Sequence, residues 1–338
     1  MGKGLEGRGW PGSIRRPSRR KTSQRSGRPV AGIEISPWIP PLVAFAISLL
    51  TSMGGVSGAF LLLPFQVSIL GFQSPAVSAT NHLFNMVAIP GGVWRFSREG
   101  RMVWPLTWVI ILGTLPGVFI GAMVRVHFLA DPESFKVFVG LVLLYLGGRL
   151  VRDLLRPARA GSAAAAAEKS FETPPVNAGP GGVSEQPSRV TVTEFNAAHL
   201  AYEFCGQQFV VSTPRLALLS LIVGMIGGIY GIGGGAIMAP FLISFFRLPV
   251  YTAAGAALMA TFVTSVAGVI FYTLLAPLYP GLAVGPDWLL GLLFGAGGLA
   301  GMYCGAMLQK HVPARTIKVI LAAAILLPAL GYLRKPFR

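Results

Sequence analysis

A glycine-rich apolar motif occurs twice in the chain. It reads Gly-Val-Ser-Gly-Ala-Phe-Leu-Leu-Leu-Pro-Phe from Gly55 and Gly-Ile-Gly-Gly-Gly-Ala-Ile-Met-Ala-Pro-Phe from Gly231. The offset of 176 positions between the two copies also relates Gly92 to Gly268. Two halves that each contain a glycine-broken apolar segment are typical of membrane transporters whose binding site lies between the repeats.

A second glycine pattern repeats farther along each half. A Gly-x3-Gly-x3-Gly run that begins at Gly113 returns at Gly297, an offset of 184 positions. Small residues spaced four apart form a flat groove on one face of a helix, and such grooves allow close helix packing in lipid. We therefore assign these runs to helix packing rather than to chemistry.

The distribution of charge places most of the chain in a membrane. Of the 338 residues, 53% are hydrophobic and 12% are charged, and the mean hydropathy is +0.64. A membrane-spanning helix needs about 20 apolar residues, and several stretches without Asp, Glu, Lys or Arg reach that length. These stretches are 38–94, 102–124, 137–148, 216–246, 248–286, 288–309 and 319–333. The pattern predicts an all-α, multi-pass membrane protein, which we expect in the cell (inner) membrane.

The net charge of +16 is not a sign of nucleic-acid binding, because nine of the 28 basic residues lie in residues 1–28 and most others flank apolar segments. We expect 1–36 to be a disordered basic tail, 37–155 the first membrane repeat and 214–333 the second, with a short tail at 334–338.

Between the repeats, we expect 156–213 to be an extramembrane linker. Its Ala163–Ala167 run and the Pro/Gly/Ser residues that follow are typical of a flexible segment. The short β-branched and aromatic runs in 189–212 predict a small β-hairpin or meander.

The two repeats contain about 8–10 helical segments, but the number of crossings has two interpretations. Counting Lys and Arg near the segments favours eight crossings, with each glycine-broken pair crossing once and both chain ends cytoplasmic. However, the connection at 95–101 is basic while its counterpart at 276–286 is uncharged. That asymmetry instead suits halves that insert in opposite senses, which requires an odd number of crossings in each half.

The segments 58–71 and 234–246 are too short to span a bilayer, because 13 residues make about 20 Å of helix. We expect each to be a half-helix joined to the preceding segment through glycines, and its free amide groups to favour an anion. The glycines expected to line the site are Gly55 and Gly58 in the first half and Gly231, Gly233, Gly234 and Gly235 in the second. Glycines that only permit tight packing are the alternative.

The polar residues of the membrane segments limit the available chemistry. These segments contain no Asp or Glu, so a carboxylate proton relay, a carboxylate metal site and a hydrolytic acid–base pair are excluded there. Asn81, His82 and Asn85 lie together just after the first half-helix, and Asn81 and Asn85 share a helical face. Their side chains could donate to an anion, and His82 could carry a proton. Thr261 occupies the position of Asn85 in the second half. Helix–helix hydrogen bonds are the alternative role for all of them.

These residues resemble those of a known family. The run Gly231-Ile232-Gly233-Gly234-Gly235 followed by Pro240-Phe241-Leu242 is similar to the glycine-rich signature of the TauE/SafE sulfite exporters, also called the toluene-sulfonate uptake permease family. Ala79-Thr80-Asn81-His82 with Ala88-Ile89-Pro90-Gly91-Gly92 also resembles a branch of it. The resemblance covers 37–155 and 214–333 and implies a transporter of a small sulfur-containing anion such as sulfite or an organosulfonate, coupled to a proton or ion gradient. Members often carry Thr-Ser shortly after the glycine element, where this chain has Thr80-Asn81 and Ala256-Ala257.

The leading hypothesis is therefore a secondary exporter or permease of a small anion, with the lipid bilayer as its surroundings. A transporter of another small solute or ion, a membrane-embedded enzyme and a scaffold that recruits a partner through 157–212 are the alternatives. We expect no catalytic residues, metal site or cofactor: Cys205 and Cys304 are far apart in the sequence and lack the spacing of metal ligands. The sequence contains no signal for oligomeric state or direction of transport.

Overall fold

The computed structural model describes residues 36–53, 56–155, 162–172, 189–312 and 314–334. The first half of this part of the chain forms α1 (Ile39–Met53), α2 (Ala59–Ser68), α3 (Ala76–Arg98), α4 (Trp104–His127) and α5 (Pro132–Leu155). The second half forms α7 (Thr213–Tyr230), α8 (Gly234–Ser244), α9 (Val250–Leu275), α10 (Trp288–Leu308) and α11 (Ala314–Arg334). Short 3-10 turns, η1 (Ala276–Leu278) and η2 (Gln309–His311), follow α9 and α10. The predicted N-terminal tail lies outside the described residues except for Ser36.

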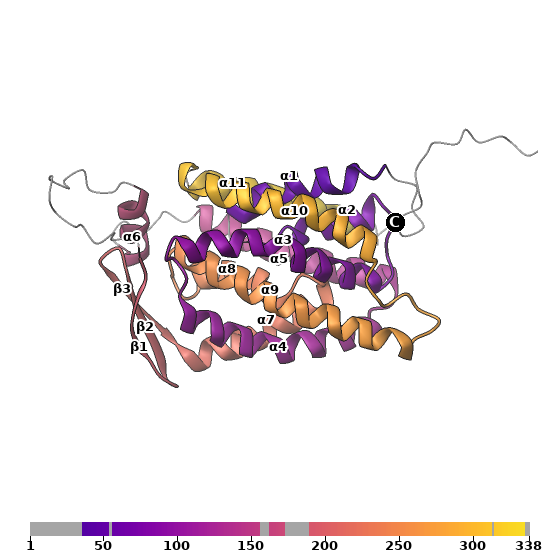
Figure 1. The fold of residues 1–338 in the computed structure, drawn as a ribbon, viewed down its shortest axis with the longest axis horizontal. Helices are drawn as coiled ribbons and strands as arrows, with labels where there is room; N and C mark the ends of the chain where they lie inside the picture. Colours follow the sequence, from indigo (N-terminus) through magenta and orange to yellow (C-terminus); the bar gives the residue numbers. More distant parts are fainter. Residues whose placement is uncertain (1–35, 54–55, 156–161, 173–188, 313, 335–338) are drawn as a thin grey trace, which may run out of the picture.

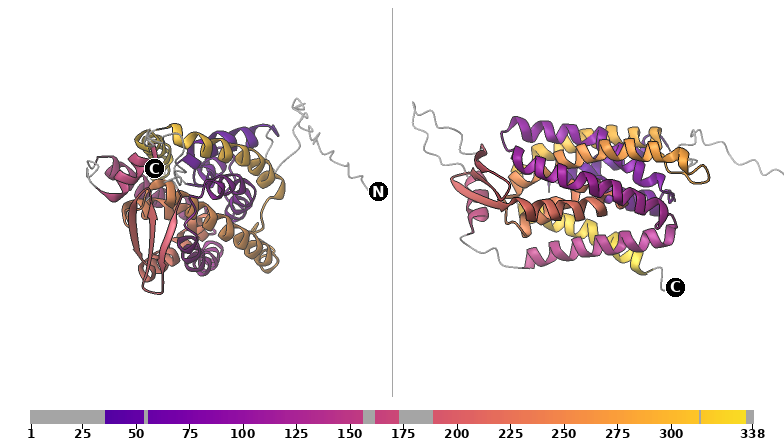
Figure 2. Two further views of the ribbon diagram at one scale, coloured as in Figure 1. Left: turned by 60° about the vertical axis from the view of Figure 1, so that its left-hand side comes forward. Right: turned by 90° about the horizontal axis from the view of Figure 1, so that it is seen from below.

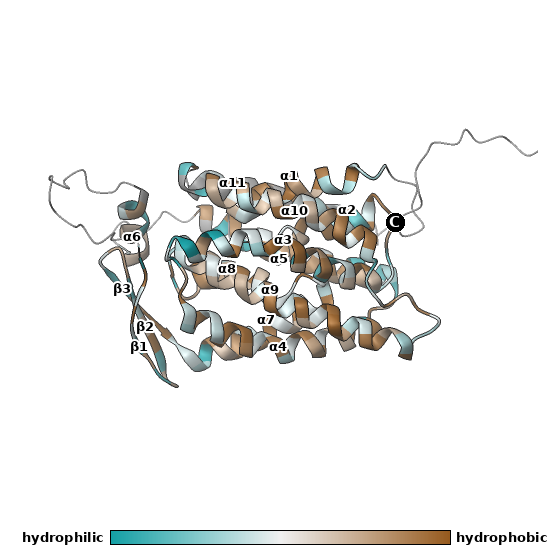
Figure 3. Cartoon of the chain, in the orientation of Figure 1, coloured by the Kyte–Doolittle hydropathy of each residue, from teal (hydrophilic) through white to brown (hydrophobic). Residues whose placement is uncertain are grey.

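The helices pack as an elongated bundle, and hydrophobic residues are distributed along all the long helices (Figures 1 and 3). Among the described residues, five helical stretches are long and apolar enough to cross a membrane: Trp104–His127, Pro132–Arg152, Thr213–Tyr230, Val250–Leu278 and Trp288–Leu308. Large side chains such as Leu112, Ile270 and Leu327 are exposed on the outside of the bundle, where hydrocarbon rather than water suits them. The prediction of an all-α membrane fold with a small β element is confirmed.

Each glycine-broken element doubles back on itself rather than crossing the bundle. Helix α7 ends at Gly231, whose φ of +82° is the left-handed conformation that glycine adopts readily. The chain then returns along α7, so that Phe241 and Phe245 near the end of α8 lie beside Arg215 and Leu218 near the start of α7. The α7–α8 pair is therefore a re-entrant hairpin, and α1–α2 is its counterpart. This corrects the interpretation in which each broken pair crosses once.

The two halves run in opposite senses. We call the end that carries the strands the sheet end and the other the far end (Figures 1 and 2). Helix α3 begins at the far end, where the Ala76 amide donates to the Ala283 carbonyl, and reaches the sheet end, where the Val190 amide donates to Gly100. Its counterpart α9 begins at the sheet end, where the Val250 amide donates to a carboxylate oxygen of Glu168. Three full-length helices follow each hairpin, so the repeats are inverted.

The Gly-x3-Gly-x3-Gly runs join the two halves by direct backbone contact. Helix α4 packs on α7 of the other half, and α10 packs on α1. A methyl group added at Gly117 would come 2.4 Å from the Leu221 carbonyl oxygen, and one added at Gly301 would come 2.4 Å from that of Phe45. Phe45 and Leu221 are separated by the repeat offset of 176. The two packing surfaces are therefore the same contact made twice, with the halves exchanged.

A small layer of one helix and three strands covers the sheet end of the bundle. It contains α6 (Ala163–Glu172) and a three-stranded antiparallel sheet in the order β1 (Thr191–Phe195), β2 (His199–Phe204), β3 (Gln207–Ser212). The Tyr202 hydroxyl lies 3.0 Å from the Thr252 hydroxyl at the start of α9, and burial raises the pKa of Tyr202. Helix α6 occupies part of the linker expected to be flexible. Its alanines favour helix, and Phe171 packs against Tyr251 with ring centroids 4.3 Å apart.

A buried arginine ties this layer to the helices. Arg101, in the connection between α3 and α4, forms an ion pair with Glu99 and donates to Gln309 Oε1 over 3.2 Å. Its guanidinium also lies over the rings of Phe96 and Phe171. Burial lowers the pKa of Arg101, and the Glu99 carboxylate opposes that effect. The contact joins α3, α6 and the end of α10 around one cation.

Candidate functional site

Asn85 on α3 connects the two re-entrant hairpins at the middle of the bundle. Its Nδ2 donates to the Ile232 carbonyl at 2.9 Å, in the turn between α7 and α8, and to Ser265 Oγ on α9 at 3.2 Å. Its Oδ1 accepts from Ser57 Oγ, which precedes α2. Because a carbonyl oxygen can only accept, the Ile232 contact fixes the direction in which the Asn85 amide points. One side chain therefore touches both broken elements.

Ser57 also organises the start of α2. Its Oγ accepts from the Ala59 amide at 3.1 Å, which satisfies one of the free amides of the first turn. One turn later, Pro64 lacks an amide hydrogen, so the Phe60 carbonyl has no helical partner. The Tyr230 hydroxyl from the end of α7 donates to that carbonyl at 3.0 Å. The two broken elements are thus joined at a second point.

His82 lies on the face of α3 that meets α9. Its Nδ1 is 3.4 Å from Ser265 Oγ, and the ring is fully buried. A methyl group at Gly268 would come 2.8 Å from the imidazole ring, so glycine at that position leaves room for the histidine. His82 Nε2 has no hydrogen-bond partner among the described residues. A buried ring nitrogen without a partner is costly, which marks this edge of the ring as a candidate ligand contact.

Asn81 faces α2 rather than the Asn85 cluster. Its Oδ1 accepts from Gln66 Nε2 at 2.7 Å, and both side chains are buried. Asn81 Nδ2 and Gln66 Oε1 have no further partner among the described residues. Asn81 and Asn85 thus lie one turn apart on α3 and bond to different neighbours. Of the three predicted polar residues of α3, Asn85 and His82 are the ones with hydrogen-bond partners in the second half among the described residues.

Gly231, Gly233 and Gly235 allow the second hairpin to approach α3 and α9. A methyl group at Gly231 would come 2.4 Å from the Ser78 backbone on α3. One at Gly233 would come 2.9 Å from Ser265 Oγ and 3.0 Å from Thr264 Oγ1. Gly233 has φ of +73° and no side chain that caps α8, whose first residue is Gly234. The start of α8 therefore lies beside hydroxyl groups of α9 at the centre of the protein.

The remaining predicted residues lie around this cluster. Gly235 packs on Thr261, whose hydroxyl donates to the Ala257 carbonyl of its own helix at 2.7 Å. Gly234 packs on Thr114 of α4 and Gly58 on Ser48 of α1, so both glycines lie against helices outside the central cluster. Gly55 lies outside the described residues.

Three contributors were not among the predicted site residues: Ser57, Gln66 and Ser265. Ser57 sits inside the repeated glycine motif, and Gln66 is a polar side chain within a stretch of 57 residues without charge, 38–94. Both were available as signals. Ser265 is likewise a polar side chain in the uncharged stretch 248–286, but its pairing with Asn85 follows only from the packing of α9 against α3.

Comparison with known proteins places this architecture in a family. The model of the family described as "Sulfite exporter TauE/SafE" matches residues 41–332. The chain belongs to the TauE/SafE sulfite exporter family. It is also similar to the "Probable membrane transporter protein YunE" of Bacillus subtilis (strain 168), with 23% identity over 219 residues, or 65% of this chain. The match covers 66% of that relative, a little under two thirds of its length. No solved structure matches the chain.

The family match confirms the resemblance drawn from the glycine motifs and spans both inverted repeats of this TauE/SafE member. Together with the apolar helices, it makes the chain a multi-pass membrane protein. Within the TauE/SafE match lie all the residues of the central cluster, from Ser57 to Ser265.

Proposed function

We propose that this protein is a secondary transporter that binds a small sulfur-containing oxyanion, such as sulfite or an organosulfonate, between its two re-entrant hairpins. The observation that carries the proposal is the meeting of both hairpins at one buried cluster of amide, hydroxyl and imidazole groups: Ser57, His82, Asn85, Ser265 and the start of α8. The family match and the likeness to a probable transporter support it.

The chemistry of the cluster favours an anion. Its side chains supply N–H and O–H donors, and among the described residues no Asp or Glu is buried. The helix start at Gly234 adds partial positive charge from its amide groups. A cation would find neutral acceptors there, namely the Ile232 carbonyl, Asn85 Oδ1 and hydroxyl oxygens, but no carboxylate from the described residues. An oxyanion of sulfur offers several acceptor oxygens, which match this set of donors.

Inverted repeats suggest how access alternates. The hairpins enter from opposite ends, with α2 returning to the far end and α8 returning to the sheet end. In this arrangement the cluster side chains are fully buried, and Asn85 joins the hairpins. We infer that opening to one end breaks the Asn85 contact with one hairpin while the other contact holds. Rocking of one repeat against the other around a fixed site is the usual consequence of such symmetry.

The test is flux into proteoliposomes that contain the purified protein. We expect saturable uptake of sulfite or an organosulfonate, and weaker competition by neutral analogues than by sulfur oxyanions. Asn81→Ala should weaken uptake because it removes an unpartnered buried donor beside the cluster. Thr107→Val is the control, since Thr107 is buried in α4 and, among the described residues, its hydroxyl bonds to the Val103 carbonyl one turn earlier. Non-saturating flux, or equal competition by neutral analogues, would contradict an anion site.

His82 is the proposed carrier of a coupling proton. It is the only histidine buried among the described residues, and its Nε2 is unpartnered. We expect an imposed pH gradient to drive uptake by the unaltered protein, and His82→Gln to lose that drive while keeping exchange of substrate across the membrane. If His82→Gln still responds fully to the gradient, coupling uses another ion or another residue.

A further inference from the structure

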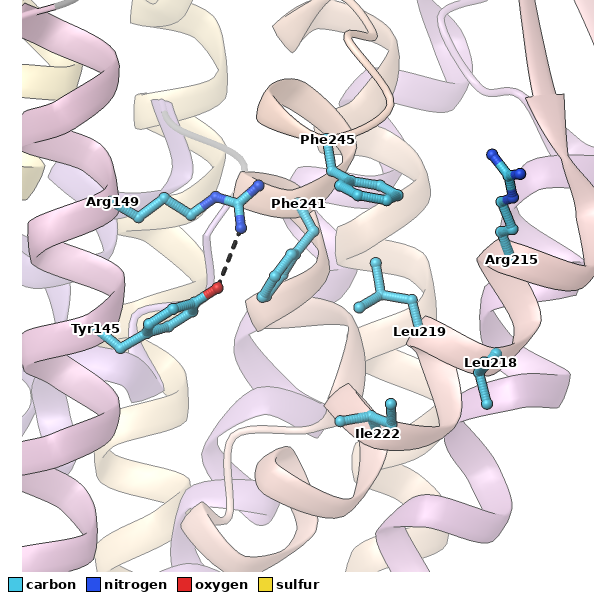
Figure 4. A pocket seen from close by; sticks show the side chains of 8 residues that line it. All are labelled: Tyr145, Arg149, Arg215, Leu218, Leu219, Ile222, Phe241 and Phe245. Atoms are coloured by element: carbon cyan, nitrogen blue, oxygen red, sulfur yellow. Dashed lines mark hydrogen bonds between the residues drawn. The ribbon is translucent and has the colours of Figure 1, made fainter.

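A groove at the sheet end remains outside the proposed site. It has a volume of about 380 Å³ and lies on the outer surface where α5, α7 and α8 meet (Figure 4). Its principal lining residues are Tyr145, Arg149, Arg215, Ile222, Phe241 and Phe245. Phe245 is 61% exposed and Ile222 48% exposed, so these apolar side chains face the surroundings of the bundle. Lipid surrounds the outer faces of α5 and α7, because the chain is a multi-pass membrane protein and these faces expose large apolar side chains such as Leu141 and Leu218.

Arg149 is held in place at one wall of this groove. Its Nε donates to Ser244 Oγ at 2.6 Å, and its Nη1 donates to the Tyr145 hydroxyl at 3.2 Å. The guanidinium lies 4.5 Å from the centroid of the Phe241 ring. These contacts use two of its five N–H donors. Tyr145 and Phe241 therefore fix a cation that still has donors to offer.

Arg215 provides a second cation on the opposite wall (Figure 4). Within the part of the chain that the structure describes, neither Arg149 nor Arg215 forms an ion pair. Arg215 is exposed at the start of α7, and Arg149 is near the end of α5. Both lie at the end of the helical bundle, at the level where lipid headgroups meet water. The groove thus combines an apolar floor with an unneutralised positive rim.

The inverted repeat supplies an internal comparison. At the far end, Ser68 and Pro64 of α2 correspond to Ser244 and Pro240 of α8. There the serine hydroxyl lies 2.9 Å from the hydroxyl of Tyr332, which takes the place of Arg149. Ile39 stands at the position of Arg215. Helix packing at this pair of positions therefore needs neither arginine.

We propose that this groove binds an acidic glycerophospholipid, with an acyl chain along Ile222 and Phe245 and the phosphate against Arg149, while Arg215 adds attraction from the other wall. A lipid satisfies both parts of the groove, since one molecule carries the apolar chain and the anionic head. Basic residues near a membrane surface each contribute about 1 kcal/mol to the binding of anionic lipid, or about fivefold in affinity. The occupant lies against α8, the half-helix whose start belongs to the central cluster.

The experiment measures lipid retention by native mass spectrometry of the full chain in detergent, with phosphatidylglycerol and phosphatidylcholine of matched acyl chains. We expect preferential retention of phosphatidylglycerol, reduced about fivefold by Arg149→Gln. Arg98→Gln is the matched control, because Arg98 is an exposed arginine at the same end on α3. Ile222→Trp should reduce retention of phosphatidylglycerol while leaving both arginines in place.

Three results would overturn the proposal. They are equal retention of the two lipids, equal losses in Arg149→Gln and Arg98→Gln, and displacement of the lipid by millimolar inorganic phosphate, which would indicate a site for free phosphate instead. Thermal unfolding of each variant without added lipid confirms that it is folded. The measurement does not depend on transport, so it stands or falls independently of the proposed substrate.

Discussion

At the scale of single residues, Asn85 shows what sequence can and cannot predict. An asparagine in a long stretch without charge is conspicuous, and the polarity of α3 predicts that it has a role. Its partners are less predictable, because the Ile232 carbonyl and Ser265 Oγ come from the other half of the chain. Backbone carbonyls carry no signal in the sequence, so the bond between the hairpins emerges only from the packed structure.

We expect Asn85→Ala to abolish most substrate flux while lowering stability only modestly. Side-chain hydrogen bonds between membrane helices average about 0.6 kcal/mol each, so the loss of three contacts should shift thermal unfolding slightly. Flux in proteoliposomes and thermal unfolding in detergent measure the two effects. Equal flux in Asn85→Ala and in the Thr107→Val control would show that Asn85 stabilises the helix packing but has no role in transport.

Gly231→Ala separates backbone strain from crowding when it is compared with Gly71→Ala. Both glycines have positive φ, +82° and +69°, which costs a residue with a side chain about 1–2 kcal/mol. Only Gly231 faces another backbone, since a methyl group would come 2.4 Å from Ser78, whereas nothing lies within 4 Å at Gly71. We expect Gly231→Ala to lower the unfolding temperature clearly more than Gly71→Ala. Similar decreases in unfolding temperature would mean that α3 can shift at Ser78 to accommodate the added methyl group at little cost.

At the scale of elements, length and direction differ in how well they can be predicted. The two half-helices follow from the sequence because the apolar segments 58–71 and 234–246 are too short to span a bilayer. The structure has helices of 10 and 11 residues there. The reversal at Gly231 does not follow, because a glycine permits both a continued path and a return path. Helix α6 was missed for another reason: its alanines are low in complexity, but Phe171 and Glu168 dock it on the start of α9.

The equivalence of the two glycine-packed contacts gives a paired prediction. Gly117→Ala and Gly301→Ala each place a methyl group 2.4 Å from a carbonyl oxygen of the facing helix. Overpacking of this kind costs about 1–3 kcal/mol, and we expect the two variants to lose similar thermal stability in detergent. Gly148→Ala on α5 is the control, because nothing lies within 4 Å of it. A large difference in thermal stability between Gly117→Ala and Gly301→Ala would show that one of the two helix pairs can move apart at little energetic cost.

At the scale of the whole molecule, the inverted repeats resolve the two interpretations of the crossings. The uncharged connection at 276–286 and the basic one at 95–101 lie at opposite ends of the bundle. Charge counting favoured eight crossings because it treated each broken pair as one span. The asymmetry between corresponding connections was the better signal, since it compares the halves directly. The constant offset of 176 positions indicates that the two halves are repeats, but it does not indicate whether they run in the same or in opposite directions through the membrane.

Labelling of single cysteines tests this topology. With Cys205 and Cys304 replaced by serine, we expect Glu194→Cys in β1 and Leu278→Cys in η1 to react with a membrane-impermeant thiol reagent from opposite sides of a sealed vesicle. Both positions are well exposed. An eight-crossing chain would place them on the same side, so labelling of both from one side would refute the inverted arrangement. Permeabilised vesicles, in which both cysteines should react, provide the control.

The exchange of packing partners between α1–α10 and α4–α7 has a consequence for biogenesis. Helix α1 leaves the ribosome long before its glycine-faced packing partner α10 has been synthesised. Until then, its small-residue surface is open to other helices in the translocon or to a second nascent copy. Neither half contains its own mate for this surface, so halves translated as separate chains should accumulate only when they are produced together.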